Sequence, residues 1–300
     1  MTKNNSPGGA AASSEKLMAH ELEKCRTEVD KRLAAFFTEG GSHAVLHESM
    51  RYSLLAGGKR IRAVICLKFC EAVCGSMEKA FDAACAIEMI HTYSLIHDDL
   101  PCMDDDDTRR GKPSNHIKYG EFTATLAGDA LQAAAFETLL GSDLPAGSVV
   151  KMARVLAQAA GPNGICGGQY LDLAAGDKTI TVNDLKEMHN MKTAVLIEAA
   201  ARLGVIAAAG TARQESAAAE YAHLVGMAFQ IRDDILDSAV GAEKNAENDE
   251  KTTFITLLGK KTCEDMIRAN TDKAIKVIED DFDQNSFLVW LAGMLAGREY

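Results

Sequence analysis

The chain has 300 residues, of which 47% are hydrophobic and 25% are charged, and its formal net charge is −11. These proportions are those of an ordinary soluble protein with a substantial core. The negative charge argues against nucleic acid as the main partner. An anionic substrate would therefore need metal ions or local clusters of Lys and Arg. No apolar run reaches the roughly 18 residues that a membrane span requires.

Residues 1–14 are rich in Gly, Ala, Ser and Asn, and we expect them to form a mobile tail before a single domain at residues 15–300. The tail has one Lys and no apolar run, so it resembles neither a secretory signal nor a transit peptide. Eight scattered cysteines predict a reduced, cytoplasmic protein. Cys66, Cys70 and Cys74 repeat along one helix stripe, where packing of thiols is favoured over a zinc site.

The apolar spacing is that of helices almost throughout the chain. Runs rich in Ala, Leu, Ile and Met occupy residues 83–96, 123–140, 195–209 and 216–236. The breaks between such runs are too short to be domain linkers. No stretch shows the sustained alternation of a strand. We therefore expect one all-α domain, a bundle of about a dozen helices, some apolar on more than one side as suits a central helix.

A basic segment, Gly57-Gly58-Lys59-Arg60-Ile61-Arg62, begins one of the predicted helices after a flexible turn. Helix N-termini and the side chains of Lys and Arg both favour phosphate, although this segment lacks the spacing of a P-loop. Other basic side chains are typical of solvated surfaces when taken singly but together suit a bound anion. They are Arg109, Arg110, Lys192 beside Thr193, and Lys251 beside Thr252.

His91 lies seven residues before Asp98 in the sequence. That spacing is about two helical turns, which puts both side chains on nearly the same face. His91 is thus placed to donate a hydrogen bond to a phosphate. A lone helical histidine is more often structural, and for His97 and His116 the structural interpretation is preferred.

The first acidic cluster reads Asp98-Asp99-Leu-Pro-Cys-Met-Asp104 and continues through residue 107. Pro101 should end or distort the preceding helix, so the carboxylates would converge from a helix end and the loop beyond it. Unneutralised, they would repel one another and their pKa values would rise. An acidic capping loop is the alternative, particularly for residues 105–107.

The second cluster consists of Asp233, Asp234 and Asp237, with Gln230 one turn earlier. In a helix Asp233 and Asp237 are i,i+4 neighbours on one face. Three carboxylates within about one turn form a hard-oxygen site suited to Mg²⁺, which retains waters and is shared with phosphate oxygens. A solvated acidic face is the alternative, but the apolar residues before Gln230 place these acids at the edge of a core.

The string at residues 96–116 resembles the first aspartate-rich motif of trans-isoprenyl diphosphate synthases, and residues 229–237 resemble the second. Further matches follow the family's order at residues 57–62, 126–130, 168–173 and 192–193, so the resemblance covers about residues 40–297. It is greatest to the bacterial farnesyl diphosphate synthases (geranyltranstransferases). The resemblance implies an all-α fold around a central cavity, usually a homodimer. It also implies a prenyltransferase of isoprenoid biosynthesis that joins isopentenyl diphosphate head-to-tail to dimethylallyl or geranyl diphosphate.

The resemblance also implies a role for each matching residue. Mg²⁺, with Mn²⁺ as the alternative and about three ions in all, would be held by Asp98, Asp99, Asp104, Asp233, Asp234 and Asp237. Isopentenyl diphosphate would be bound by Lys59, Arg62, His91 and Arg110. The allylic diphosphate would be held by Arg109, Lys192, Thr193, Gln230 and Lys251. The catalytic set would be Asp98, Asp99, Asp104, Lys192 and Asp233.

The chemistry suits these residue types. Metal ions neutralise charge on a leaving diphosphate, so that ionisation to an allylic cation becomes accessible. The alkene of isopentenyl diphosphate then attacks, and the released diphosphate can take the proton, so no protein base is required. An apolar cavity shields the cation from water.

Product length is predicted from Tyr93 and Ser94, because in this family residues just before the first motif form the cavity floor. A bulky ring five residues before the motif resembles the synthases that stop at a C15 product. An ordinary core aromatic is the alternative, because ideal geometry puts Tyr93 about 7.5 Å along the axis from Asp98 but well round the helix. We therefore predict a farnesyl diphosphate synthase, with a C20-forming geranylgeranyl diphosphate synthase as the nearest alternative. A class I terpene cyclase and a non-catalytic partner subunit are more distant alternatives. The loop at residues 239–251 is shorter than is usual in the family.

Overall fold

The computed structural model describes residues 7–176, 180–243 and 252–298, with the backbone alone for residues 7–13 and 239–243. Lys251, for which a role in binding the allylic diphosphate is predicted, lies outside the described residues.

The described residues are almost entirely helical, which confirms the predicted all-α fold. Apart from the five-residue helices α5 and α12, the helices match the predicted dozen. The bounds in chain order are α1 Pro7–Leu33, α2 Ala44–Leu54, α3 Ile61–Cys74, α4 Phe81–Asp98, α5 Asn115–Tyr119, α6 Glu121–Leu140, α7 Ala146–Ala160, α8 Ile165–Ala175, α9 Val182–His189, α10 Val195–Ala207, α11 Ala212–Glu243, α12 Phe254–Leu258, α13 Lys260–Glu279 and α14 Ser286–Gly297. Two short helical turns, η1 Glu78–Ala80 and η2 Asn190–Ala194, and the two-residue strands β1 Thr108–Arg109 and β2 Lys112–Pro113 complete the described elements.

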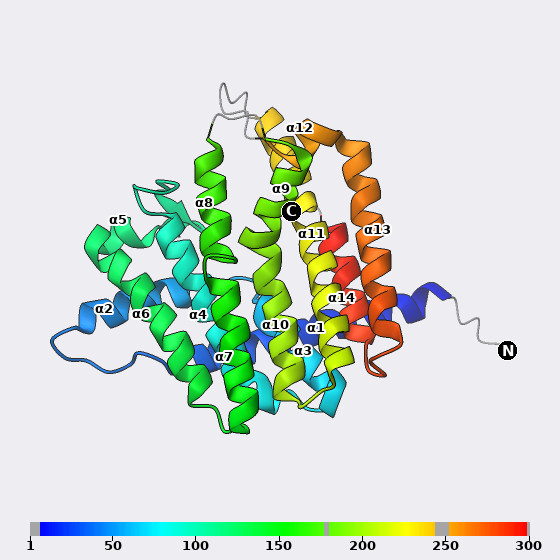
Figure 1. Ribbon diagram of the computed structural model, residues 1–300, viewed down its shortest axis with the longest axis horizontal. Helices are drawn as coiled ribbons and strands as arrows, with labels where there is room; N and C mark the ends of the chain where they lie inside the picture. The colour runs from blue at the N-terminus through cyan, green and yellow to red at the C-terminus, as the bar shows by residue number, and fades with distance from the viewer. Residues whose placement is uncertain (1–6, 177–179, 244–251, 299–300) are drawn as a thin grey trace.

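Helix α10 lies at the centre of the bundle, between α7 and α11 in Figure 1, and it also packs on α3 and α4. Its residues are buried on nearly every side, as a helix rich in Ala, Leu, Ile and Val requires. Gly204 allows this packing, because a Cβ there would overlap the backbone carbonyl of Cys66 on α3. The predicted central helix is therefore formed by residues 195–207.

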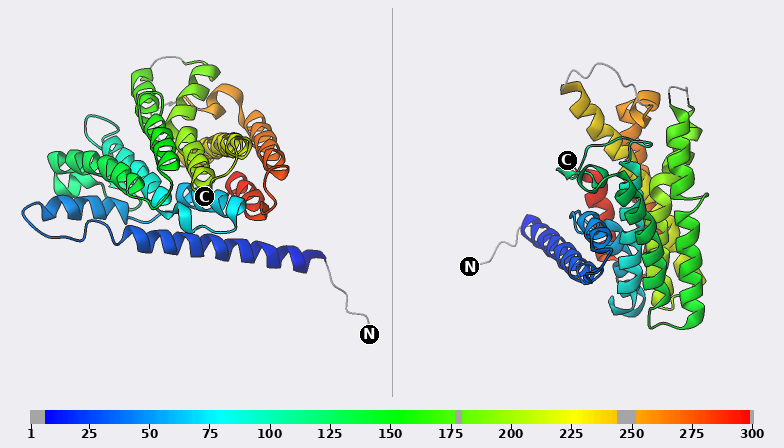
Figure 2. Two further views of the ribbon diagram at one scale, coloured as in Figure 1. Left: turned by 60° about the horizontal axis from the view of Figure 1, so that its bottom comes forward. Right: turned by 90° about the vertical axis from the view of Figure 1, so that its left-hand side faces the viewer.

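Helix α1 lies along one side of the bundle, next to α3 and α4 (Figure 2). It begins at Pro7, inside the segment for which the composition predicts a mobile tail. Proline is tolerated in the first turn of a helix, and the alanines at positions 10–12 are strong helix formers, so the helix starts earlier than expected. The domain boundary at residue 15 stays a prediction.

The direction of the helices places both acidic motifs toward the same end of the bundle. Helices α4 and α11 both rise from the lower to the upper part of Figure 1, and α4 ends at Asp98. The turns that join α3 to α4, α6 to α7 and α10 to α11 lie at the opposite, lower end. In the described part of the chain, no helix combines the length and the apolar character that a bilayer crossing would need.

Candidate active site

The first acidic wall forms where α4 ends and the chain turns back on itself. Asp98 is the last residue of α4, as Pro101 predicts, and the backbone N–H of Asp104 donates to the Asp98 carbonyl at 2.9 Å. Burial raises the pKa of the Asp98 carboxyl to about 6, with repulsion from Asp104 and Asp99 adding to the shift and Lys192 and Arg109 opposing it. The predicted repulsion between these carboxylates is therefore present.

Asp99 is neutralised within the motif. Its buried carboxylate accepts hydrogen bonds from Nε of Arg109, at 2.8 Å, and from Nη2 of the same guanidinium. Arg109 also forms an ion pair with Asp106 at 3.0 Å. Two residues with separate predicted roles, cation binding for Asp99 and substrate binding for Arg109, are thus joined to each other. Asp98 and Asp104 are the carboxylates that remain free of Arg109.

The second acidic wall lies on α11, and its three carboxylates have different surroundings. Asp233 forms an ion pair with Arg298, which directly follows α14. The buried Asp234 accepts a hydrogen bond from the backbone N–H of Phe254 at 2.9 Å and one from Gln230 at 3.2 Å. Asp234 therefore caps the start of α12, whereas Asp237 is exposed.

A π-helical turn, η2, presents Lys192 and Thr193 between the walls. Lys192 donates to Asp172 on α8 at 2.5 Å, and Thr193 donates to the Gln230 side chain at 3.1 Å. Gly168 on α8 lies against the backbone of Lys192 so closely that a Cβ would overlap it. Turns of this wide type are rare and are frequent at functional sites.

A basic cluster lies on the same side of α4 as Asp98 and contains Arg62, His91 and Arg110. Nη1 of Arg62 lies 3.4 Å from Nε2 of His91, and Nε of Arg62 is buried without a hydrogen-bond partner among the described residues. Burial, with repulsion from Arg62 and Arg110, holds the pKa of His91 well below its usual range, so the ring is neutral. A buried, unsatisfied donor beside other cationic groups is suited to an anion.

Arg110 is positioned by a strained hairpin that the sequence pattern did not reveal. Strands β1 and β2 pair Thr108 with Pro113, and the turn between them puts Arg110 at a φ of 54° and Gly111 at 74°. Positive φ at both central residues is typical of a tight hairpin but is unfavourable for arginine. The guanidinium donates to the carbonyl of Gly57, and a Cβ on Gly58 would lie 3.1 Å from Cζ of Arg110.

Lys59 and Arg60 of the basic segment lie apart from this cluster. Lys59 is exposed and lines a separate cleft of about 620 Å³ together with Trp290 and Arg298. Arg60 is buried and bound to Asp30 at 2.8 Å and to Glu88 at 3.1 Å, so its role is structural.

Three polar residues of the site had no role assigned from the sequence. Gln169 donates to Asp104 at 3.3 Å, while its own Oε1 is buried without a partner among the described residues. Oδ1 of Asn190, in η2, is likewise buried without a hydrogen-bond partner among the described residues. Asp172 binds Lys192. Gln169 and Asp172 stand in a segment that resembles a family motif, and this was the signal that pointed to them.

The donor chemistry fits Mg²⁺ in an open arrangement. Among the described residues, no three His, Cys, Asp or Glu side chains are close enough to form a metal site by themselves. Mg²⁺, however, usually binds one or two carboxylates, several waters and the oxygens of a phosphate. Asp98 and Asp104 supply oxygen ligands and an excess of negative charge that a cation would offset. These residues would hold Mg²⁺ jointly with a bound diphosphate.

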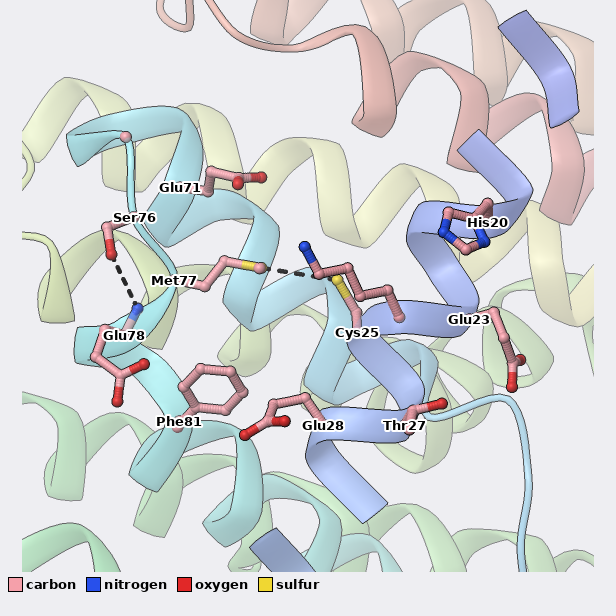
Figure 3. A pocket seen from close by; sticks show the side chains of 12 residues that line it. His20, Glu23, Cys25, Thr27, Glu28, Glu71, Ser76, Met77, Glu78 and Phe81 are labelled. Carbon is pink, nitrogen blue, oxygen red and sulfur yellow. Dashed lines mark hydrogen bonds between the residues drawn. The ribbon is translucent and has the colours of Figure 1, made fainter. Parts of the chain in front are cut away.

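A second hollow, far from these residues, lies between α1 and the turn after α3 (Figure 3). It has a volume of about 660 Å³, and its four glutamates all pair with basic side chains. The pairs are Glu23 with Arg26, Glu28 with Arg32, Glu71 with Lys68, and Glu78 with Arg32. Its carboxylates are therefore already neutralised by side chains of the protein.

Residues 43–289 match the model of a protein family described as polyprenyl synthetase. The chain belongs to this family. Among its relatives is a chloroplastic geranylgeranyl pyrophosphate synthase of Capsicum annuum, which is 43% identical over 266 residues, or 85% of this chain and 72% of that protein.

Solved structures agree with this assignment. A farnesyl/geranylfarnesyl (FPP/GFPP) synthase from Zymomonas mobilis superimposes with a TM-score of 0.85 at 32% identity, covering 93% of this chain and 98% of that one. A geranyltransferase from Legionella pneumophila gives the same TM-score at 33% identity, covering 94% of this chain and 98% of that one.

In this polyprenyl synthetase, Tyr93 is turned toward the junction of α7 and α8. Its hydroxyl donates to the carbonyl of Ala160 at 3.3 Å and lies 3.7 Å from Sγ of Cys166. Ala160 and Cys166 line a hollow of about 340 Å³ that also borders α6. Ser94 is different, because its hydroxyl donates to the backbone carbonyl of His91 within α4. Of the two predicted chain-length residues, Tyr93 is thus the one whose side chain contacts residues that line a hollow.

Proposed function

We propose that this polyprenyl synthetase condenses isopentenyl diphosphate with allylic diphosphates and releases geranylgeranyl diphosphate as its main product. One observation carries the condensation: His91 on α4 lies beside Arg62, whose buried Nε has no partner among the described residues, and two turns later α4 ends at Asp98, whose carboxyl has a raised pKa. Two anionic substrates can therefore bind side by side, one on guanidinium groups and the other through cations.

The allylic diphosphate binds between the acidic walls. Asp98, Asp104 and Asp233 hold Mg²⁺, and Asp99 contributes by orienting Arg109. The magnesium ions, when bound, offset the charge that grows on the departing diphosphate. Lys192, fixed by Asp172, would donate its remaining N–H groups to the same diphosphate, whereas Thr193 would turn its single O–H from Gln230 to do so. Asp234 supports this wall through α12, and Asp237 is an outer ligand.

Isopentenyl diphosphate binds at the basic cluster. Arg62 and Arg110 pair with its diphosphate, and the neutral ring of His91 donates one hydrogen bond. Lys59, on the exposed edge of the same segment, contributes long-range attraction. Because isopentenyl diphosphate is held by protein side chains and not by metal ions, its binding should persist when divalent metal is removed.

The C20 product is supported by the relatives, several of which are named geranylgeranyl pyrophosphate synthases. These names favour the C20 alternative over the C15 product predicted from Tyr93. Incubation with labelled isopentenyl diphosphate and each allylic primer, followed by dephosphorylation and chromatography, decides the length. A dominant C15 alcohol with every primer would contradict the C20 proposal, and absence of any product would contradict the condensation.

Farnesyl diphosphate synthase is the second candidate, and a specific contact favours it. The hydroxyl of Tyr93 contacts Ala160 and Cys166, which line the hollow beside α6. A ring in this position would limit the space for a growing chain. The same product assay separates the two candidates.

We propose a homodimer that forms through α6. Its outer face carries a row of exposed apolar side chains at helical spacing, with Phe122 76%, Leu126 51% and Leu140 57% exposed. Exposed apolar rows of this kind mark association surfaces. Light scattering after gel filtration should give twice the chain mass for the wild type. The mass should fall toward that of one chain for Phe122→Glu, whereas an unchanged mass would exclude this face.

The cytoplasmic location also stays a proposal. It is supported by the eight free cysteines of the described residues, which suit a reducing compartment. The chloroplastic names of the relatives supply the alternative. Microscopy of a carboxyl-terminal fluorescent fusion of the full chain would distinguish the two locations.

A further inference from the structure

Arg298 occupies the second acidic wall. Its guanidinium forms an ion pair with Asp233 and lies 3.9 Å from the centre of the Phe229 ring. Phe229 and Asp233 are i,i+4 neighbours on α11, so one arginine covers one helical face. The Arg298 side chain is only 13% exposed. A positive charge therefore stands where the proposed function requires a divalent cation.

The chain before Arg298 is anchored by a separate contact. Nε of Arg232 donates to the carbonyl of Ala296 at 2.7 Å, which fixes the end of α14 to α11. Arg298 itself has left the helix and is extended, with φ −60° and ψ 144°. Its side chain can therefore move away from Asp233 while α14 stays in place.

The arginine is held incompletely at this position. Its Nε is buried without a hydrogen-bond partner among the described residues, and its Nη2, the atom paired with Asp233, makes no regular hydrogen bond there. A monovalent guanidinium with an unsatisfied N–H is a weaker partner for a carboxylate than Mg²⁺ that also binds a diphosphate.

We propose that Arg298 is a positioning residue that neutralises Asp233 in the ligand-free enzyme and is displaced when a divalent cation and a diphosphate bind. This inference rests on the proposed function, because it takes Asp233 as a cation ligand. The arginine holds the carboxylate in place without metal and makes cation binding a competition. Displacing Arg298 costs free energy, which is offset only when the bound diphosphate supplies further oxygen ligands to the cation.

Trp290 offers a direct reporter of the displacement. It is the single tryptophan of the sequence and lines the cleft of about 620 Å³ that Arg298 also lines. Movement of the guanidinium out of this cleft changes the charge and solvent near the indole. Intrinsic fluorescence therefore follows Arg298 without any catalytic turnover.

The test titrates the full chain with Mg²⁺ in the presence of inorganic diphosphate and records Trp290 emission. We expect a saturable change in the wild type. For Arg298→Gln the Mg²⁺ midpoint should fall by about two- to fivefold, the range expected when one partly exposed ion pair is removed. Arg298→Lys retains the charge and should stay nearer the wild type. The matched control is Arg213→Gln, which removes the 2.6 Å ion pair with Asp281 in another part of the fold and should leave the midpoint unchanged.

A metal-free measurement gives a second, independent result. Asp233→Asn removes the other partner, so its ligand-free emission should match that of Arg298→Gln and differ from that of the wild type. Circular dichroism melting of each variant verifies that it is folded. An unchanged or raised Mg²⁺ midpoint in folded Arg298→Gln would overturn the inference while leaving the proposed function intact. Failure of calorimetry to detect Mg²⁺–diphosphate binding to the wild type would contradict the proposed function itself and this inference with it.

Discussion

His91 and Asp98 lie two turns apart on α4, and burial shifts both toward their uncharged forms. It lowers the pKa of the imidazole and raises that of the carboxyl to about 6. Helix α4 thus carries both a neutral hydrogen-bond donor for one anion, His91, and a carboxylate that can bind a metal cation, Asp98.

Cation binding should depend on pH through Asp98. Its carboxyl pKa is raised in the folded state from its ordinary value of 3.8 to about 6, so protons compete with Mg²⁺ as the pH falls through 6. In the metal-free protein, the free energy of unfolding changes with pH in the opposite direction to Mg²⁺ affinity. The folded state binds the Asp98 proton more tightly than the unfolded state does, so stability should rise as the pH falls from 7 toward 4. Calorimetric Mg²⁺ titrations at several pH values check the first point and thermal melting the second. Asp98→Asn should remove both dependences, and their persistence in that variant would assign them to another group.

Isopentenyl diphosphate binding should depend on Arg62. Arg62→Gln removes a buried positive charge that faces His91, and a lost charged hydrogen bond costs about 1.5–3 kcal/mol, or roughly ten- to a hundredfold in KM for this substrate. The KM for the allylic diphosphate should change little. Steady-state kinetics with each substrate varied in turn measures both. A matched control is Arg51→Gln, whose side chain binds backbone carbonyls outside the site. Equal effects on the two KM values would contradict separate binding sites.

Product length should depend on Tyr93. Tyr93→Ala opens space toward Ala160 and Cys166, so the product distribution should shift to longer chains. Tyr93→Phe keeps the ring and loses only the hydroxyl contacts, so its products should match those of the wild type. Chromatography of the dephosphorylated products measures the chain lengths made by each variant. If Tyr93 is an ordinary core residue, Tyr93→Ala will instead leave product length unchanged and cost stability of about 3–5 kcal/mol.

The position of Lys192 should depend on Gly168. A methyl group at Gly168 would overlap the Lys192 backbone, so Gly168→Ala should move η2 and lower kcat, with a loss of stability of about 1–3 kcal/mol from overpacking. Gly147→Ala is the control, since a Cβ there meets no atom within 4 Å among the described residues. Rate measurements at saturating substrate, together with melting curves, separate the two effects. A full rate in folded Gly168→Ala would show that η2 tolerates displacement.

The helices were predictable because the apolar periodicity of the chain is strong. The run expected at residues 83–96 falls within α4, and the run at 195–209 matches α10 except for its last two residues. The hairpin that carries Arg110 was not predictable in this way, because each strand has only two residues and its turn depends on a strained φ. Tertiary contacts, and not local pattern, determine such a conformation.

The sequence pointed to groups of residues that the structure brings close together, but it did not reveal how their side chains pair. The sequence predicts that Asp98 and Asp104 approach each other, because the proline between them ends the helix. The structure shows this approach. The sequence could not reveal that Asp99 binds Arg109, nor that Asp234 caps α12. Arg298 carried no signal at all, because nothing in a sequence shows that a residue after the last helix will meet one that lies 65 positions earlier.

The placement of the α6–α7 turn at the end of the bundle opposite the acidic motifs has a practical consequence. Residues 141–145 form a short surface connection that shares no side chain with either diphosphate site. A fluorescent label or an affinity peptide inserted there would leave the entrance to the proposed active site unobstructed. The enzyme could then be immobilised by its base while substrates enter and products depart from the opposite end.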